Sequence, residues 1–155
     1  MKPGPLSRLW LAGLGVGLAL TAARPARADD AANRRLVEHA MHDLFVNRDL
    51  SAIDRYWGGH PYRQHNPHIA DGTASLRQLV ATLPGNFRYQ PGLIVADHDI
   101  VMLHGSYTGF GPQPLVVVDI FRIAHGRIVE HWDVMQPEIP AARTASHRPM
   151  FAPGQ

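Results

Sequence analysis

The 155-residue sequence contains no cysteine. A disulfide framework, a thiol nucleophile and a cysteine-ligated metal site are therefore excluded. The sequence also lacks a serine nucleophile elbow and a glycine-rich phosphate-binding loop. Candidates for chemistry remain among its ten histidines and 13 acidic residues. The length is sufficient for one domain with its own hydrophobic core and too short for two ordinary domains.

Acidic residues are also missing from the first 28 positions. This segment starts with the short basic stretch 1–8, continues with the uncharged apolar run 9–23 and ends in Ala26-Arg27-Ala28. The arrangement is typical of a secretory signal peptide cleaved near Ala28, and the apolar run is shorter than the roughly 20 residues of a membrane span. We therefore predict a periplasmic or secreted protein that has no membrane association after cleavage.

Removal of this segment changes the charge of the chain. The segment carries four of the 15 basic residues and none of the 13 acidic residues, so the formal charge falls from +2 to 11 − 13 = −2. No basic patch indicates a nucleic-acid partner. The remaining sequence divides into a domain at 29–137 and a Pro-rich, irregular C-terminal tail at 138–155.

Apolar residues recur at helical spacing in three segments of the first half. The first predicted helix follows Asp30, as its cap, and carries its apolar stripe over 36–45. A second short helix begins near Asp49, and a third begins near Thr73. The polar segment 60–72 between them is rich in turn-forming residues and is predicted to be a loop that can hold a short strand.

The second half changes to strand-like patterns separated by short turns. Short connections favour antiparallel neighbours, and helices followed by such strands indicate an α+β fold. We expect a curved antiparallel sheet wrapped by the N-terminal helices, with a cone-shaped pocket between them. The predicted strands are 87–95, 100–110, 115–123 and 127–135.

The turn before the last strand decides which side chains share a face. A three-residue turn at 124–126 requires positive φ only at Gly126, and it is favoured because histidine rarely adopts that conformation. In this register Asp119 faces His131 directly. A two-residue turn at 125–126 would instead place Asp119 opposite the following tryptophan and weaken the cluster.

The residues Asp119, His131 and Asp133 are the candidate catalytic group. An aspartate beside a histidine on a mostly apolar face can hold one mobile proton near neutral pH, which suits general acid–base catalysis. Asp133 lies on the same face and can fix the tautomer of the imidazole ring. A structural buried ion pair would give the same pattern, so both interpretations remain open.

Other polar and aromatic residues of the loop and strands are candidates for contacts with a substrate. A metal site is not expected, because His65 and His68 lie in a predicted loop that contains a proline and are not spaced at i, i+4 on a helix. A facial triad of His104, Asp119 and His131 has no recognised motif to support it. The candidate substrate-binding residues are Tyr62, Gln64, His65, Asn66, His104, Phe121 and Trp132.

Two segments, "YRQHNPHIADG" and "YTGFGPQPLVVVDIFRIAHGRIVEHWDVMQ", together with the helical start, resemble the SnoaL-like polyketide cyclases. These belong to the superfamily named after nuclear transport factor 2, which has a cystatin-like roll, and the resemblance over 31–137 is strongest to an aldol-condensation-like bacterial branch. It implies a curved sheet around a conical pocket and proton transfer by a pocket Asp or His, without metal or cofactor. Carried over to this chain, Asp119, His131 and Asp133 move the proton, while His65 and His104 orient a carbonyl.

The resemblance also implies a homodimer that pairs through the outer face of the sheet, which carries the apolar run Val116, Val118, Ile120, Trp132 and Val134. Together these patterns predict an exported, cofactor-free enzyme that performs aldol cyclase-like or isomerase-like proton transfer on a small apolar carbonyl compound. The alternative is a non-catalytic pocket that binds a small ligand or a partner protein. Catalysis requires Asp119 and His131 to border a cavity that a ligand can enter.

Overall fold

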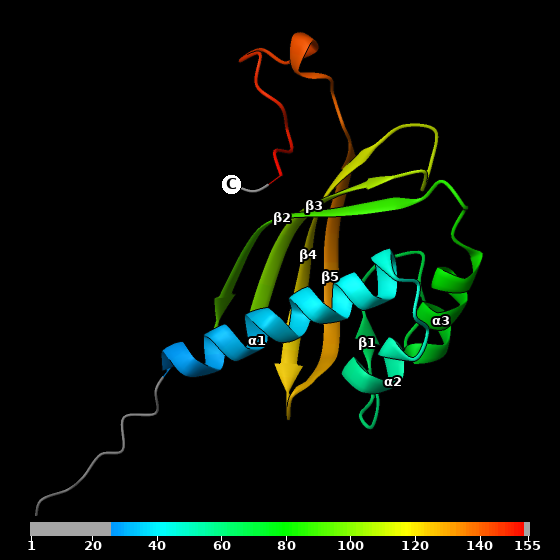
Figure 1. Cartoon of the computed structure of the whole chain (residues 1–155), viewed down its shortest axis with the longest axis vertical. Helices are drawn as coiled ribbons and strands as arrows, with labels where there is room; N and C mark the ends of the chain where they lie inside the picture. Colours follow the sequence, from blue (N-terminus) through cyan, green and yellow to red (C-terminus); the bar gives the residue numbers. More distant parts are fainter. Residues whose placement is uncertain (1–25, 154–155) are drawn as a thin grey trace, which may run out of the picture.

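The computed structural model of the chain describes residues 26–153, so the expected signal peptide at 1–28 lies almost wholly outside the described residues. Three helices precede the long strands of the fold (Figure 1). A π-helical turn, His42–Val46, continues the first helix toward the loop. The helices are α1 (Ala26–Met41), α2 (Ala52–Tyr56) and α3 (Thr73–Thr82).

Five strands form one curved sheet in the order β1-β5-β4-β3-β2. The four long strands follow one another through short turns and pair antiparallel, as expected. The short strand β1 pairs parallel to β5, so the sheet is mixed. The α+β prediction is confirmed. The strands are β1 (Arg63–Gln64), β2 (Arg88–Asp97), β3 (Ile100–Thr108), β4 (Leu115–Ala124) and β5 (Arg127–Pro137).

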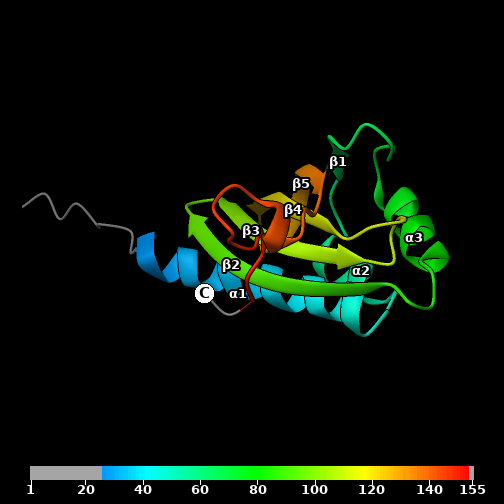
Figure 2. The same ribbon diagram turned by 90° about the horizontal axis from the view of Figure 1, so that it is seen from above.

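Helix α1 lies along one face of the sheet, which we call the inner face (Figures 1 and 2). Its buried side chains Val37 and Ala40, with Leu44 of the π-helical turn, join the same core cluster as Leu103 and Val117 of the strands. Their spacing of three to four residues puts them on one side of the helix, and burial of each aliphatic side chain contributes about 1.5–3 kcal/mol. This layer fixes the position of the inner face of β3 and β4.

The start of α1 differs from the prediction. The helix begins at Ala26, upstream of Asp30, so Asp30 does not cap it. The Asp30 carboxylate instead accepts a hydrogen bond from the backbone N–H of His98, at 2.9 Å. The residue therefore ties the helix to the turn between β2 and β3, a contact that depends on tertiary structure.

The predicted three-residue turn between β4 and β5 is wrong. Ala124 pairs with Arg127, so the turn has two residues, and both His125 (φ 52°) and Gly126 (φ 68°) adopt positive φ. Two-residue hairpin loops of this kind match the right-handed twist of the strands. That gain in strand geometry outweighs the modest cost of the left-handed conformation at histidine.

A β-bulge then shifts the register by one further residue. Ile123 pairs with Ile128 but Arg122 pairs with Glu130, so Val129 is the extra residue of β5. Beyond the bulge Asp119 lies opposite Asp133, not opposite His131 as predicted. Because the turn and the bulge together shift the register by two residues, the side chains keep the predicted faces of the sheet.

The C-terminal tail folds back onto the sheet on the side opposite α1, the outer face (Figure 2). Apart from a single 3₁₀ turn, Ala141–Arg143, it is irregular, as expected. Phe151 is buried and meets His104 edge-on at 5.6 Å between ring centroids. A Cβ at Gly92 would lie 2.8 Å from the Phe151 ring, so this position of β2 has to remain small.

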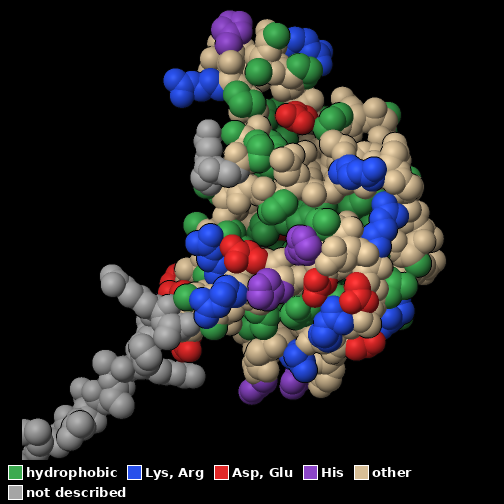
Figure 3. Space-filling view, viewed as in Figure 1, with side chains coloured by type: hydrophobic (Ala, Val, Ile, Leu, Met, Phe, Trp, Pro, Cys, Tyr) green, Lys and Arg blue, Asp and Glu red, His purple; other side chains and the backbone are tan. Residues whose placement is uncertain are grey.

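The surface seen in Figure 3 carries acidic and basic side chains interspersed, without a broad area of one sign among the described residues. None of the helices within residues 26–153 combines the length and the apolar character that crossing a membrane requires.

Candidate active site

A small cleft opens between the inner face of the sheet and the surrounding helices, and its volume is about 60 Å³. Clefts with mostly apolar walls and a few convergent polar groups are the usual form of a small-ligand site. The apolar walls come from every layer of the fold: Met41, Phe45, Ile69, Leu76, Leu79, Phe87, Phe110, Phe121 and Met135.

Pairing of β1 with β5 aligns the polar side chains of the cleft. Gln64 lies beside His131 in this parallel pair, and side chains two residues apart point to the same side of a strand. The Gln64 Oε1 atom lies 2.9 Å from His131 Nδ1. Two residues further along each segment, Asn66 Nδ2 donates to Asp133 Oδ2 at 2.6 Å. Because both segments advance by two residues on the same side, Gln64 contacts His131 and Asn66 contacts Asp133.

Backbone N–H groups fix the orientation of both amides. The Asn66 N–H donates to Gln64 Oε1 at 3.0 Å, and the His68 N–H donates to Asn66 Oδ1 at 2.8 Å. These contacts identify the oxygen of each amide, because an N–H group can only donate. Since Gln64 offers His131 an acceptor, the imidazole must carry a proton on Nδ1.

His131 and Asp119 share one further proton. His131 Nε2 lies 3.1 Å from Asp119 Oδ1, and the two residues are only 8 % and 2 % exposed. The contact requires either an imidazolium facing a carboxylate or a neutral imidazole that accepts from a carboxylic acid. Either arrangement makes the pair neutral overall, with one proton that can move between the two atoms.

Tyr107 closes the other side of the Asp119 carboxyl. Its O–H donates to Asp119 Oδ2 at 2.9 Å. Burial raises the pKa of Tyr107 well above its usual range, and the negative charge of Asp119 adds to the rise. Tyr107 therefore stays protonated as a donor, and both oxygens of Asp119 are occupied.

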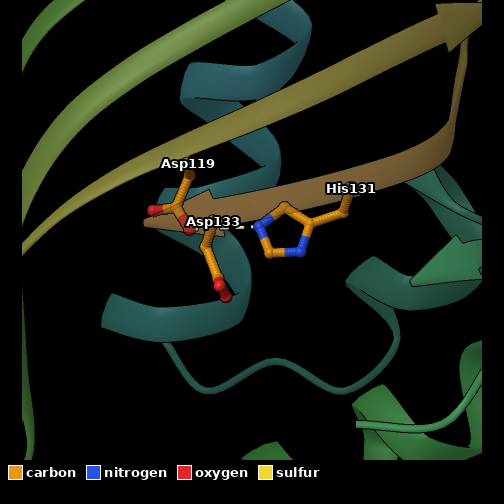
Figure 4. A group of neighbouring side chains, drawn as sticks. All are labelled: Asp119, His131 and Asp133. Carbon is orange, nitrogen blue, oxygen red and sulfur yellow. Dashed lines mark hydrogen bonds and ion pairs between the residues drawn. The ribbon is translucent and has the colours of Figure 1, made fainter. Parts of the chain in front are cut away.

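Asp133 differs from Asp119 in having an oxygen left for a ligand. Its side chain is half-buried and lines the cleft, and Asn66 occupies only Oδ2. Figure 4 shows its carboxyl directed away from Asp119 while His131 reaches toward Asp119. No donor among the described residues is hydrogen-bonded to Asp133 Oδ1. Asp133 is thus the carboxylate placed to accept a proton from a bound molecule.

Seven of the ten predicted site residues line the cleft. Asp119 and His131 border a cavity, which is the condition that catalysis requires. Tyr62, Gln64 and Asn66 line the cleft, and the two amides also position His131 and Asp133. The residues that line the cleft are Tyr62, Gln64, Asn66, Phe121, Asp119, His131 and Asp133.

Three predicted residues lie on the outer face and do not border the cleft. His65 stacks on Trp132 with 4.7 Å between ring centroids, and His104 contacts Phe151. Alternation along the strands is the cause, because His65 and Trp132 follow Gln64 and His131 by one position. The expectation that His65 and His104 orient a carbonyl in the pocket is corrected by this placement.

Sequence reasoning missed Tyr107. Tyr107 alternates with Leu103 and Gly105 along β3, so the period-two pattern could have placed it on the inner face. No local signal shows that its hydroxyl meets Asp119 on the neighbouring strand.

The only group of potential metal ligands among the described residues is the candidate catalytic group itself. One ligand atom from each of Asp119, His131 and Asp133 lies within 4.8 Å of the others. An ion there would have to displace the contact between His131 and Asp119, since both nitrogens of His131 have partners. The alternative triad with His104 does not assemble, because His104 lies on the outer face.

Comparisons with known proteins match this architecture. The family model of the SnoaL-like domain matches residues 37–131. Solved structures with similar folds include a protein from Kribbella flavida assigned as a ketosteroid isomerase (17% identity, 82% of this chain and 94% of that chain, TM-score 0.62). An LEH-like epoxide hydrolase from M. tuberculosis also matches (22% identity, 69% and 84%, TM-score 0.54). No curated protein sequence matches the chain.

A protein from Acidithiobacillus ferrooxidans assigned as a polyketide cyclase is a further structural neighbour (15% identity, 67% and 87%, TM-score 0.56). Identities at this level establish the shared fold and leave the reaction to be argued from the site.

Proposed function

The chain belongs to the SnoaL-like family, and we propose that its cleft catalyses cofactor-free proton transfer on a small, neutral carbonyl compound. The observation that carries the proposal is the neutral Asp119–His131 pair beside Asp133, which lines the cleft and has no hydrogen-bond donor on Oδ1 among the described residues. Neighbours assigned as a ketosteroid isomerase and a polyketide cyclase support this reaction class by analogy of fold.

In the proposed reaction Asp133 Oδ1 removes a proton from the carbon next to the carbonyl group. The electron pair of the broken C–H bond moves toward the carbonyl oxygen and forms an enolate. Return of the proton to a different carbon gives isomerisation, and attack of the enolate carbon on a second carbonyl gives an aldol product. A positioned base of this kind typically contributes about 10²–10⁴-fold to the rate.

The surroundings of Asp133 suit this role. The apolar walls exclude water, which strengthens electrostatic interactions inside the cleft. Asn66 holds the carboxylate in one orientation, and the Asp119–His131 pair can supply positive charge beside it as the shared proton moves onto His131. The substrate decides whether isomerisation or ring closure follows.

The direct test is deuterium exchange at the α-carbon of cyclohexanone in D₂O, followed by proton NMR. This probe suits a small cleft, and exchange reports enolate formation whichever product the natural substrate gives. We expect Asp133→Asn to lose about 10²-fold or more of the protein-dependent exchange rate. Asp97→Asn, which removes an exposed carboxylate from the end of β2, is the matched control and should be unaffected.

The alternative function predicts a different outcome. If the wild-type protein binds cyclohexanone but does not accelerate exchange, the cleft is a ligand-binding pocket without catalysis. Exchange that survives in Asp133→Asn would remove Asp133 from the mechanism. Loss of exchange on treatment with EDTA, restored by a divalent metal, would contradict the cofactor-free reaction.

Export is part of the proposal, with cleavage near Ala28. Intact-mass measurement of the protein recovered from the periplasm or medium should give a chain that begins at Asp29. A full-length mass in the cytoplasmic fraction would contradict it.

We also propose a homodimer that pairs through the outer face. Val134 is 68% exposed and Met102 is 42% exposed there, beside the area contacted by the tail. Exposed apolar side chains gathered on one sheet face are typical of an interface. Val134→Glu should convert the dimer to a monomer in light scattering; a monomeric wild-type protein would contradict the proposal.

A further inference from the structure

Two hydrogen-bond donors of the cleft lack acceptors within residues 26–153. Trp57, directly after α2, is 1% exposed and lines the cleft. Its indole N–H is buried and has no hydrogen-bond acceptor among the described residues. The indole N–H lies near the Tyr62 oxygen and lowers the pKa of Tyr62, which burial raises. This contact does not meet hydrogen-bond geometry.

The hydroxyl of Tyr62 is the second donor. Its oxygen accepts a hydrogen bond from Gln64 Nε2 at 3.2 Å, a direction fixed by the amide orientation described above. The Tyr62 proton therefore has to go elsewhere, and no hydrogen-bond acceptor for it occurs in the described part of the chain. Burial, with the negative charges of Asp119 and Asp133, raises the pKa of Tyr62 well above its usual range. The group is a donor at neutral pH.

Unpaired buried donors are rare because each one forfeits the hydrogen bond that it makes to water in the unfolded chain. Two adjacent ones in the wall of a cleft indicate that a ligand supplies the acceptor. We propose that Trp57 Nε1–H and Tyr62 O–H together bind the carbonyl oxygen of the ligand. This inference rests on the proposed function and adds the group that polarises the carbonyl, a role assigned from sequence to His65 and His104.

The charges of the cleft restrict the class of ligand further. No lysine or arginine is among the residues that line it, while Asp133 adds a negative charge to the neutral Asp119–His131 pair. A carboxylate or phosphate would therefore be repelled and left without a cationic partner. Two neutral donors instead suit a neutral ketone or aldehyde, whose oxygen gains negative charge as the enolate forms.

The segment 62–66 sets the order of these groups. Tyr62 contributes the oxygen site, Gln64 holds His131, and Asn66 holds Asp133, so alternate residues of one extended segment arrange the whole site. The ligand is expected to lie with its oxygen toward Tyr62 and its α-carbon toward Asp133.

The experiment compares cyclohexanone with methylenecyclohexane, which has the same shape and no acceptor oxygen. Dissociation constants are measured by NMR titration for the wild type, Tyr62→Phe and Trp57→Phe, with Trp132→Phe of the outer face as control. Each cleft variant should bind cyclohexanone roughly three- to tenfold more weakly and methylenecyclohexane with unchanged affinity, because one hydrogen bond is removed. Trp132→Phe should change neither constant.

A spectroscopic signature separates oxygen binding from packing. The carbonyl ¹³C resonance of labelled cyclohexanone should move downfield on binding the wild-type protein, and less on binding Tyr62→Phe. Equal loss of affinity for both probes, or a bound shift unchanged in Tyr62→Phe, would overturn the inference. If Trp57→Phe does not fold, the Tyr62→Phe result decides.

Failure of this inference is distinguishable from failure of the proposed function. A Tyr62-dependent carbonyl shift in a protein that does not accelerate deuterium exchange supports the oxygen site and rejects catalysis. Asp133-dependent exchange that is unaffected by Tyr62→Phe and Trp57→Phe supports catalysis and rejects the oxygen site.

Discussion

Strand β5 carries a histidine–carboxylate contact on each of its two faces. On the inner face His131 meets Asp119 at 3.1 Å, and on the outer face His65 meets Glu130 at 3.0 Å. The residue types and distances are almost the same. Their surroundings differ in the charge of the neighbouring groups and in the exposure of the histidine side chain.

The outer contact is one part of a network of cations. Glu130 also accepts from Arg122 Nε at 2.9 Å, and Arg63 lies 3.8 Å away. The hydrogen bond from His65 lowers the pKa of Glu130, Arg122 adds to this effect, and so Glu130 stays ionised. The His65 side chain is 45% exposed to solvent. This arrangement connects β1 and β4 to β5, and none of its residues lines the cleft.

No arginine or lysine lines the cleft beside the inner contact. The proton shared by His131 and Asp119 has two alternative positions. Tyr107 and Gln64 hold the pair in place without fixing that proton, since each is a neutral group. The two contacts therefore differ in environment and not in residue type: the inner pair has a buried histidine, neutral partners and an adjacent cleft, which are the conditions that the proposed proton transfer needs.

The largest effect that distinguishes the two contacts is expected for Asp119→Asn. The substitution removes the shared proton and leaves an amide that can donate to His131 Nε2 and accept from Tyr107, so exchange on cyclohexanone should fall about 10²-fold. Because the amide keeps both contacts of the carboxyl, the free energy of unfolding should fall by about 1 kcal/mol or less. Urea denaturation and NMR exchange measure the two effects; loss of stability with unchanged exchange would make the inner pair structural, like the outer one.

A smaller effect is expected for Gln64→Met, which keeps the shape of the side chain and removes the acceptor of His131 Nδ1–H. The imidazole then loses its fixed tautomer, and exchange should slow roughly tenfold, the equivalent of one hydrogen bond. The pH dependence of the exchange rate should shift as well, which a purely structural role of Gln64 would not produce. Arg63→Met, on the outer side of β1, is the matched control.

The smallest effect is expected for Glu130→Gln on the outer face. Exchange on cyclohexanone should not change. The unfolding free energy at pH 7 should fall by only about 1 kcal/mol although Glu130 is buried, because its partners His65 and Arg122 are partly exposed and water can solvate them. The lowered pKa of Glu130 means that its ionised form stabilises the fold above the ordinary glutamate pKa. This contribution is lost as the pH falls through the folded-state pKa, so urea midpoints of variant and wild type should converge at acid pH. A slower exchange rate in Glu130→Gln would show that the outer network acts on the site.

Sequence reasoning placed Asp119, His131 and Asp133 on one face through an incorrect register. The predicted turn was one residue too long, and the bulge at Val129 was not foreseen. The faces were nevertheless correct, because burial of the apolar face tolerates shifts of two residues and forbids shifts of one. The predicted cross-strand neighbour of Asp119 was wrong for the same reason. A shift of two residues changes which residues lie opposite each other and leaves their faces unchanged.

The parallel pairing of β1 with β5 had no signal in the sequence. Gln64 and His131 are 67 residues apart, and the segment around Gln64 has the composition of a loop. The prediction that His65 lies in the pocket was wrong for this reason, because only the register of β1 decides that Gln64 faces inward and His65 outward.

By itself the sequence determined the α+β fold and the face of the sheet that carries the acids and the histidine, because periodicity is a local property that burial enforces. Only the tertiary structure decided which amide holds which functional group, which carboxylate keeps a free oxygen and which donors are left for a ligand. Those properties depend on hydrogen bonds between segments distant in the chain, and the geometry of such bonds is set after the layers have packed.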